Sequence, residues 1–435
     1  MTPAQMITLE IEDLGAEGDG IARRDGSAVY IPFALPGETV TLKGPLRSVG
    51  KGNSSGEIGN IDTSSPDRIE PSCRHFGQCG GCRLQHVSTP AVEIHKRRVL
   101  EQALSRKGLT PETLSATVSA PLHSRRRARF DYQRTGRSGK LGFKIRRSHD
   151  SIDIAMCPIL TPSLEKLVGD LRRLLDAMPS MAKGGAVQVT ETDSGFDILL
   201  IPARPADLNL EQRERIAVWC AANNIARLCW DDGDGPQPVA ARHQPQTKFG
   251  EVPVDLPVNA FLQPSAAGEK ILVDLVQQAL SRHCRRTKRI ADLFSGCGSL
   301  SLPIAGSEGC VVDAFDIDGA MIAALRQAAS RSQPVLRVNA DRRDLFNAPL
   351  TPSELKPYDA VIFDPPKAGA AAQAGELATS SVPVVIAVSC NPSTLSRDLR
   401  QLVDGGYTLI SSTPVDQFTW SGQLEAVAVL TKRVK

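Results

Sequence analysis

Two polar segments in the last third of the 435-residue chain carry side chains that could do chemistry. Asp364 begins the motif Asp-Pro-Pro-Lys after the apolar run 360–363, and Cys390 lies in the motif Ser-Cys-Asn-Pro after the apolar run 382–388. Open α/β sheets place ligands at the carboxyl ends of their strands, so we expect both side chains at one sheet edge. A thiol there is a candidate nucleophile, although many cysteines are buried structural residues instead.

A thiol and carboxylates at such an edge suit methylation at carbon 5 of a uracil. This carbon is too weak a nucleophile to attack a sulfonium methyl group, but addition of a thiolate at carbon 6 gives an enolate whose carbon 5 can attack. Covalent catalysis thus divides one difficult step into easier ones. A base must then remove the carbon 5 proton. We assign this role to Glu425, at the start of the last apolar run, although a surface carboxylate at a strand end is an equally common role.

A glycine-rich turn precedes both segments. The sequence 292–299 lies between an apolar run and a helical pattern, and Asp316 follows Gly298 by 18 residues at the end of the next apolar run. Glycines let the backbone approach a ligand, and an acidic side chain at this distance can bind both ribose hydroxyls. Ser301 replaces the third glycine of the dinucleotide pattern, so S-adenosylmethionine is favoured over a dinucleotide; a turn without any ligand is the alternative.

Four of the ten cysteines form a second candidate site. Cys73, Cys79 and Cys82 lie close together in sequence, and Cys157 precedes a proline far along the chain. Thiolates at this spacing can face one metal centre, which a distant fourth cysteine can complete. On spacing alone, a zinc site made of the first three cysteines and His86 is equally good.

Composition and charge restrict the class of protein. The formal net charge is +3, yet residues 121–150 hold ten Lys or Arg against two Asp, a local charge of +8 that leaves −5 for the remainder. A concentrated basic segment is typical of nucleic-acid binding. An apolar fraction of 41% without a long apolar run argues against disorder and against a membrane span. We see no secretory signal, and we expect a cytoplasmic protein with no membrane contact and no obligate protein partner.

Three domains are needed to position these residues. Short alternating runs broken by Gly and Pro predict a small β-barrel over residues 1–62. Residues 63–257 form a central α+β domain with a helix over 90–109 and a hairpin over 186–202. The alternating helices and strands of residues 258–435 predict a parallel α/β sheet of the Rossmann-like type. Within it we expect a helix over 268–282 and strands over 289–294, 310–315, 359–363, 382–388 and 424–431.

Taken together, these segments resemble the RNA (uracil-5-)-methyltransferase family, and most closely its members that act on 23S ribosomal RNA and carry an iron–sulfur cluster. Residues 11–38 look like the TRAM domain, a small barrel that binds RNA. The glycine turn, the two catalytic motifs and Glu425 match the family in order and spacing, over nearly the whole chain.

The resemblance implies a role for individual residues. Cys390 would be the nucleophile and Glu425 the proton-abstracting base. Six residues would contact S-adenosylmethionine, namely Gln263, Phe294, Ser299, Asp316, Asp341 and Asp364. Ser299 replaces the usual Asn, and Gln423 stands where a His is common. A [4Fe–4S] cluster would be held by Cys73, Cys79, Cys82 and Cys157, in a structural role or in RNA contact.

The activity implied is methylation of carbon 5 of a uridine in 23S ribosomal RNA, with the target base extruded from its stack. The same reaction on transfer RNA fits the catalytic motifs. RNA cytosine-5 methyltransferases commonly carry a second Cys where this chain has Pro-Pro-Lys, and radical S-adenosylmethionine enzymes space their first two cluster cysteines by three residues rather than five. A non-catalytic RNA-binding protein is the alternative from a different class.

Overall fold

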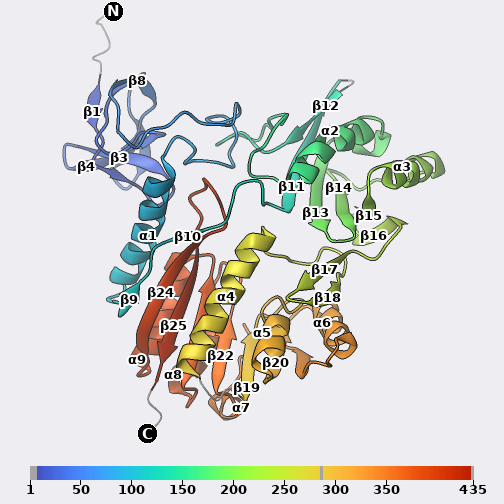
Figure 1. Cartoon of the computed structure of the whole chain (residues 1–435). Helices are drawn as coiled ribbons and strands as arrows, with labels where there is room; N and C mark the ends of the chain where they lie inside the picture. Colours follow the sequence, from blue (N-terminus) through green and yellow to red (C-terminus); the bar gives the residue numbers. More distant parts are fainter. Residues whose placement is uncertain (1–6, 137, 285–287, 433–435) are drawn as a thin grey trace, which may run out of the picture.

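The structure is a computed structural model that describes residues 7–136, 138–284 and 288–432. A small N-terminal β domain and a central α+β domain lie at the same end of a larger C-terminal α/β domain (Figure 1). In the described part of the chain, every helix is too short or too polar to cross a membrane.

The N-terminal domain consists of two small sheets around one apolar core, where the alternating runs predict a small β-barrel. Val29, Ile31 and Val40 are buried in that core, while their neighbours in the strands are more exposed. The two sheets are built from β1 (Thr8–Glu10), β5 (Thr39–Leu42) and β8 (Ile58–Thr63), and from β2 (Asp13–Leu14), β3 (Asp19–Arg24), β4 (Ser27–Pro32), β7 (Asn53–Ser55) and β6 (Arg47–Gly50).

The central domain is a six-stranded sheet that packs on helices. In spatial order its strands are β12 (Ser138–Gly142), β11 (Arg127–Thr135), β13 (Gly185–Thr192), β14 (Gly195–Pro202), β15 (Ile225–Asp231) and β16 (Pro236–Ala241). Its helices are α2 (Pro162–Asp176), the short 3-10 helix η1 (Pro179–Met181) and α3 (Leu210–Ala222). The predicted hairpin is confirmed as β13 and β14. A separate hairpin, β17 (Gln246–Phe249) and β18 (Val252–Asp255), leads to the last domain.

The C-terminal domain is a nine-stranded, mainly parallel sheet with helices on its faces. In spatial order the strands are β10 (Val118–Ser119), β24 (Thr408–Asp416), β25 (Glu425–Thr431), β23 (Val384–Ser389), β22 (Ala360–Phe363), β19 (Arg289–Leu293), β20 (Val311–Asp316) and β21 (Val338–Arg342), and β9 (Thr113–Leu114) also pairs with β24. The helices are α1 (Thr89–Ser105), α4 (Ala266–His283), α5 (Ser301–Glu308), α6 (Gly319–Arg331), α7 (Pro352–Leu355), α8 (Ala371–Thr379) and α9 (Pro392–Asp404). Each strand expected in this region is present, with limits that differ by one or two residues.

Residues 89–119 depart from the expected division of the chain. Strands β9 and β10 pair in parallel with β24, and α1 packs against β24 and α9. This part of the segment 63–257 therefore belongs to the sheet of residues 258–435. Such short strands, whose partner lies some 300 residues away in the chain, cannot be identified from the local sequence. For the rest of the segment, the division at 257 stays a prediction.

Candidate active site

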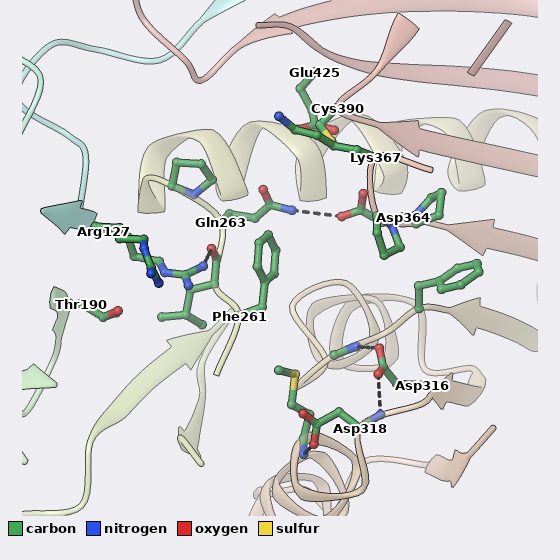
Figure 2. Close-up of a pocket in the computed structure, with 18 of the residues that line it drawn as sticks. Arg127, Thr190, Phe261, Gln263, Asp316, Asp318, Asp364, Lys367, Cys390 and Glu425 are labelled. Carbon is green, nitrogen blue, oxygen red and sulfur yellow. Dashed lines mark hydrogen bonds between the residues drawn. The ribbon is translucent and has the colours of Figure 1, made fainter. Parts of the chain in front are cut away.

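The proposed nucleophile and base lie at one edge of the sheet. Cys390 directly follows β23, whose residues are all buried, and the side chain of Asn391 caps α9 by accepting a hydrogen bond from the Ser393 N–H. Strand β25 is antiparallel to β23, and its second residue, Ala426, pairs with Ser389. The start of β25 therefore lies beside the end of β23, which brings Glu425 close to Cys390 (Figure 2).

A cavity of about 700 Å³ opens between this edge and the sheet of the central domain. The wall formed by the C-terminal domain includes Gln263, Phe294, Asp316, Asp364, Cys390 and Glu425. Its central-domain wall includes Arg125, Arg127, Arg129, Gln188 and Thr190. Two domains thus supply chemically different walls, one with the reactive groups and one with cations (Figure 2).

Three hydrogen bonds connect the two carboxylates of the site. The Gln263 amide donates to Asp364 Oδ2 over 3.0 Å, and the Gln417 amide donates to Gln263 Oε1 and to Glu425 Oε2, both over 2.9 Å. Glu425 is only 2% exposed, and its Oε1 has no hydrogen-bond partner among the described residues. One oxygen of this carboxyl group is therefore held in place and the other is left to accept a proton.

Burial sets the protonation of the reactive groups. It raises the pKa of Glu425 well above the ordinary value, and the charge of Asp364 adds to this rise. Burial likewise raises the pKa of Asp364 to about 7. The pKa of the Cys390 thiol is raised to about 11 by burial and then by the charges of Glu425 and Asp364, while Lys367 acts in the opposite direction. The free protein therefore keeps this thiol protonated at neutral pH.

The glycine turn, residues 292–299, lines the part of the cavity near Asp316, which is the lower part in Figure 2. Gly298 has a φ of +90°, and a Cβ there would lie 2.3 Å from Leu325 Cδ1, so only glycine fits. Asp316 accepts hydrogen bonds from the backbone N–H groups of Gly296 and Asp318, each over 2.9 Å. The turn and the start of α6 thus fix a carboxylate on the wall of the cavity.

Apolar side chains line the cavity beside Asp316. The rings of Phe294 and Phe346 have centroids 5.4 Å apart, and Ile317 and Met321 line the cavity as well. Sequence reasoning selected Phe294 and missed the other three, because no spacing rule connects loops that follow different strands. The slot is suited to a flat, partly apolar group such as a purine.

Two of the expected cofactor residues lie outside the cavity lining. Ser299 is half-buried in the turn that leads to α5. Asp341 is an exposed residue of β21 and accepts a hydrogen bond from Arg326 over 3.1 Å. Asp341 pairs with Phe315, the neighbour of Asp316, and Ser299 directly follows Gly298, so both lie near the cavity without lining it, and both assignments stay predictions.

The predicted basic segment is divided among three environments. In β11, Arg127 and Arg129 face the cavity opposite Thr190 and Gln188 of β13, whereas Ala128 and Phe130 face the core. Arg126 instead forms a buried ion pair with Glu269 of α4 over 2.7 Å.

Further along the segment, basic residues line a second groove of about 680 Å³ beside residues 73–82, which we call the cysteine bend. They are Lys144, Arg146 and Arg147, joined by Arg83. Arg137 lies outside the described residues. The segment thus contributes to two basic grooves, and in the second Glu17 and Asp19 form ion pairs with three of the four cations.

The four cysteines of the expected cluster lie within electrostatic reach of one another. Burial raises the pKa of Cys82 to about 11 and that of Cys157 to about 12, with smaller contributions from the neighbouring thiols, Cys73 among them. Over residues 7–136, 138–284 and 288–432, however, no three His, Cys, Asp or Glu side chains are arranged to hold a metal ion. The ring of His86 packs against Phe33 and Phe76.

Known proteins resemble the chain over its whole length. Residues 254–433 match the tRNA (Uracil-5-)-methyltransferase family, and residues 2–43 match the TRAM domain. An uncharacterized RNA methyltransferase of Brucella suis is 39% identical over 99% of each chain. The 23S rRNA (uracil(1939)-C(5))-methyltransferase RlmD of Halomonas elongata is 32% identical over 97% of this chain and 89% of its own.

A solved structure shares the fold. The tRNA (uracil-54, C5)-methyltransferase of Pyrococcus abyssi, in complex with S-adenosyl-L-homocysteine, superposes with a TM-score of 0.75 at 20% identity and covers 98% of this chain and 99% of its own. Together with the full-length relatives, this confirms the resemblance that the motifs indicate. The chain belongs to the RNA (uracil-5-)-methyltransferase family and carries an N-terminal TRAM domain.

Proposed function

We propose that the protein methylates carbon 5 of a uridine in 23S ribosomal RNA, with S-adenosylmethionine as methyl donor and with a covalent adduct between Cys390 and carbon 6. The observation that carries the proposal is one cavity that joins a thiol, the carboxyl group of Asp364, the buried carboxyl group of Glu425, a glycine turn and an arginine-lined wall. The full-length similarity to a 23S ribosomal RNA enzyme supports the choice of RNA.

The lower part of the cavity fits the cofactor. Asp316 is fixed by two backbone N–H groups and suits the ribose hydroxyls, while Phe294 and Phe346 suit the adenine ring. Bound S-adenosylmethionine supplies an electrophilic methyl group on its sulfonium. Asp364 and Gln263, which are hydrogen-bonded to each other, lie between this part and Cys390.

The chain's own residues account for the first bond that forms. The Cys390 thiol loses its proton to water, and the positive charge of Lys367 favours the thiolate that results. The thiolate adds to carbon 6 of the uridine, and the electron pair of the double bond moves to the carbon 4 carbonyl as an enolate. Carbon 5 of this enolate is nucleophilic enough to take up the methyl group.

Glu425 accounts for the release of the product. Its unpaired Oε1 takes the carbon 5 proton, the electron pair of that bond restores the double bond, and the Cys390 thiolate leaves carbon 6. A buried carboxylate with a raised pKa is a stronger base than an exposed one, which suits this step. Gln417 holds the other oxygen of Glu425 during the transfer.

The base is tested by the Glu425→Gln variant. It should form the adduct and transfer the methyl group but fail to release, so a band of RNA linked to protein accumulates on denaturing gels when S-adenosylmethionine is present. The double variant with Cys390→Ala is the control and should give no band. Ordinary turnover by Glu425→Gln would remove Glu425 as the base.

The RNA target is tested in cells that lack the protein. Mapping of 5-methyluridine should show one modified position lost from 23S ribosomal RNA, restored by the wild-type chain but not by Cys390→Ala. Loss from a transfer RNA instead would favour the alternative target, which the name of the matched family also describes.

We further propose that Cys73, Cys79, Cys82 and Cys157 bind a [4Fe–4S] cluster. All four donors are thiols, and the pKa of Cys157 responds to the charges of Cys73 and Cys82, which supports a common site. The charges that shift the pKa of His86 are those of Arg68 and Glu38, so the zinc set that includes His86 receives no such support. The cluster would tie the bend around Cys79 to the segment before α2.

Iron and sulfide analysis of protein purified without oxygen tests the cluster. The Cys157→Ser variant should lose iron, whereas His86→Ala and Cys220→Ser, which removes a buried thiol of the core, should keep it. Stoichiometric zinc without iron in the wild-type protein would contradict the proposal.

A further inference from the structure

Lys96 of α1 is a buried cation outside the cavity lining. Its side chain is 2% exposed. The Lys96 ammonium forms an ion pair with Asp416 and donates hydrogen bonds to the carbonyl oxygens of Phe418, over 3.3 Å, and Gln423, over 3.0 Å. A buried ammonium needs such compensation, because an unpaired charge in the interior is costly.

The three acceptors lie at the two ends of one loop. Asp416 is the last residue of β24, and Gln423 lies two residues before β25 begins at Glu425. One side chain of α1 therefore binds both ends of the connection 417–424, which we call the base loop. Figure 1 shows α1 beside β24, on the side of the sheet nearest the N-terminal domain.

The base loop carries side chains that contact Glu425, the proposed proton acceptor, or line the cavity. Gln417 donates to Glu425 and to Gln263, and both Phe418 and Gln423 line the cavity. Lys96 thus binds atoms next to Gln417 on one side and close to Glu425 on the other, without lining the cavity itself.

Other parts of the molecule meet the same loop. The N–H groups of Arg83 and Leu84, which directly follow the cysteine bend, donate to the carbonyl oxygen of Trp420 over 2.7 and 3.0 Å. Gly422 packs against the N-terminal domain, since a Cβ there would lie 3.0 Å from Glu17 Cα. These bonds hold the middle of the loop. Lys96 joins its two ends from α1, and within the loop Ser421 Oγ also links them, since it donates to the Phe418 carbonyl over 2.9 Å and accepts from the Gln423 N–H over 3.1 Å.

We propose that Lys96 is a positioning residue for proton abstraction: by binding both ends of the base loop, it holds Gln417 and Glu425 at the carbon 5 proton of the bound uridine. This inference rests on the proposed function of Glu425. Displacement of a base by about 1 Å costs on the order of 100-fold in rate, so a rigid loop matters for the second chemical step more than for binding.

The Lys96→Met variant tests the proposal in the full-length enzyme. We expect kcat to fall about 10- to 100-fold while KM for RNA and for S-adenosylmethionine changes less than about threefold. The methylated RNA–protein adduct should accumulate during turnover, as in Glu425→Gln. The control is Arg227→Met, which breaks a similarly buried ion pair with Asp197 in the central sheet and should not raise the adduct level.

A second variant separates positioning from stability. Lys96→Met leaves the buried Asp416 without its cation, whereas Lys96→Met with Asp416→Asn removes both charges and should still accumulate adduct. Wild-type adduct levels in either folded variant would overturn the proposal, and so would unfolding of both variants while Arg227→Met stays folded. If Glu425→Gln itself accumulates no adduct, the proposed function of the base is what fails.

Discussion

The Cys390 thiol has an environment that opposes its own ionisation. Burial and two neighbouring carboxyl groups raise its pKa to about 11, and Lys367 compensates only in part. Such a thiol reacts slowly in the free protein, because little of it is thiolate. In the proposed mechanism, the positive sulfonium of the bound cofactor would favour its ionisation.

This environment predicts the pH dependence of Cys390 alkylation in the free protein. The rate of modification by iodoacetamide, followed by the mass of the Cys390 peptide, should keep rising beyond pH 9, since the thiolate fraction grows until pH passes the raised pKa. Asp364→Asn should move the curve to lower pH, because it removes a negative charge. A plateau below pH 8 would contradict the structure.

Sequence reasoning at this scale found residues that follow strands and missed residues that reach the site from loops. Cys390 and Asp364 could be predicted because each follows an apolar run by no more than two residues. Gln417 and Lys96 could not, since their roles depend on hydrogen bonds between segments that are far apart in sequence. The roles of Cys390 and Glu425 stay predictions until the adduct is measured.

The glycine turn is the element that depends most on its residue type. Gly298 adopts a φ of +90°, and its Cα faces the buried side chain of Leu325 in α6. Gly296 is also left-handed, with a φ of +55°, but the nearest atom to a Cβ there is Met321 Sδ at 3.8 Å. The two glycines share a backbone requirement and differ in the space beside them.

This difference predicts unequal effects of two substitutions. Gly298→Ala should lower the free energy of unfolding by about 2–4 kcal/mol and weaken S-adenosylhomocysteine binding, because the buried Leu325 side chain must move and the left-handed backbone is strained. Gly296→Ala should cost about 1 kcal/mol, the penalty of the left-handed backbone alone. Denaturant unfolding and titration calorimetry measure both quantities, and equal costs for the two variants would contradict the packing seen around Leu325.

At the scale of elements, the buried central strands could be predicted and the strands toward the sheet margins could not. Strand β22 and the first five residues of β23 are continuous apolar runs, and β19, which leads into the glycine turn, combines three apolar residues with Arg289 and Asp292. Strands β9 and β10 are two residues long, and only their pairing with β24 identifies them. The local composition of these two segments does not indicate that they pair with β24.

At the scale of the whole molecule, basic side chains gather in two places. The net charge of +3 conceals one basic surface at the cavity, with Arg127 and Arg129, and another beside the cysteine bend, with Arg83 and Arg147. Both adjoin the region where the three domains meet, so RNA that enters the cavity is expected to contact both. The sequence shows that basic residues are concentrated in one segment, but only the fold shows that they lie on two separate surfaces.

Salt dependence of RNA binding tests this arrangement. Arg129→Ala should weaken binding about 3- to 10-fold and reduce the slope of log affinity against log salt by about one, because one phosphate contact is lost. Arg215→Ala, on the exposed helix α3 away from the cavity, is the matched control and should change neither quantity. Equal effects of the two variants would argue against RNA binding at the β11 wall.

The central claim is that Cys390 attacks carbon 6 of a uridine in RNA. Its most direct measurement is the mass of the denatured protein after incubation with S-adenosylmethionine and RNA that contains 5-fluorouridine, whose carbon 5 carries no proton for Glu425 to remove. We expect a stable species with the mass of protein, RNA and one methyl group, linked through the Cys390 peptide and absent in Cys390→Ala. Attachment at another residue, or methylation of ordinary RNA by Cys390→Ala at the wild-type rate, would contradict it.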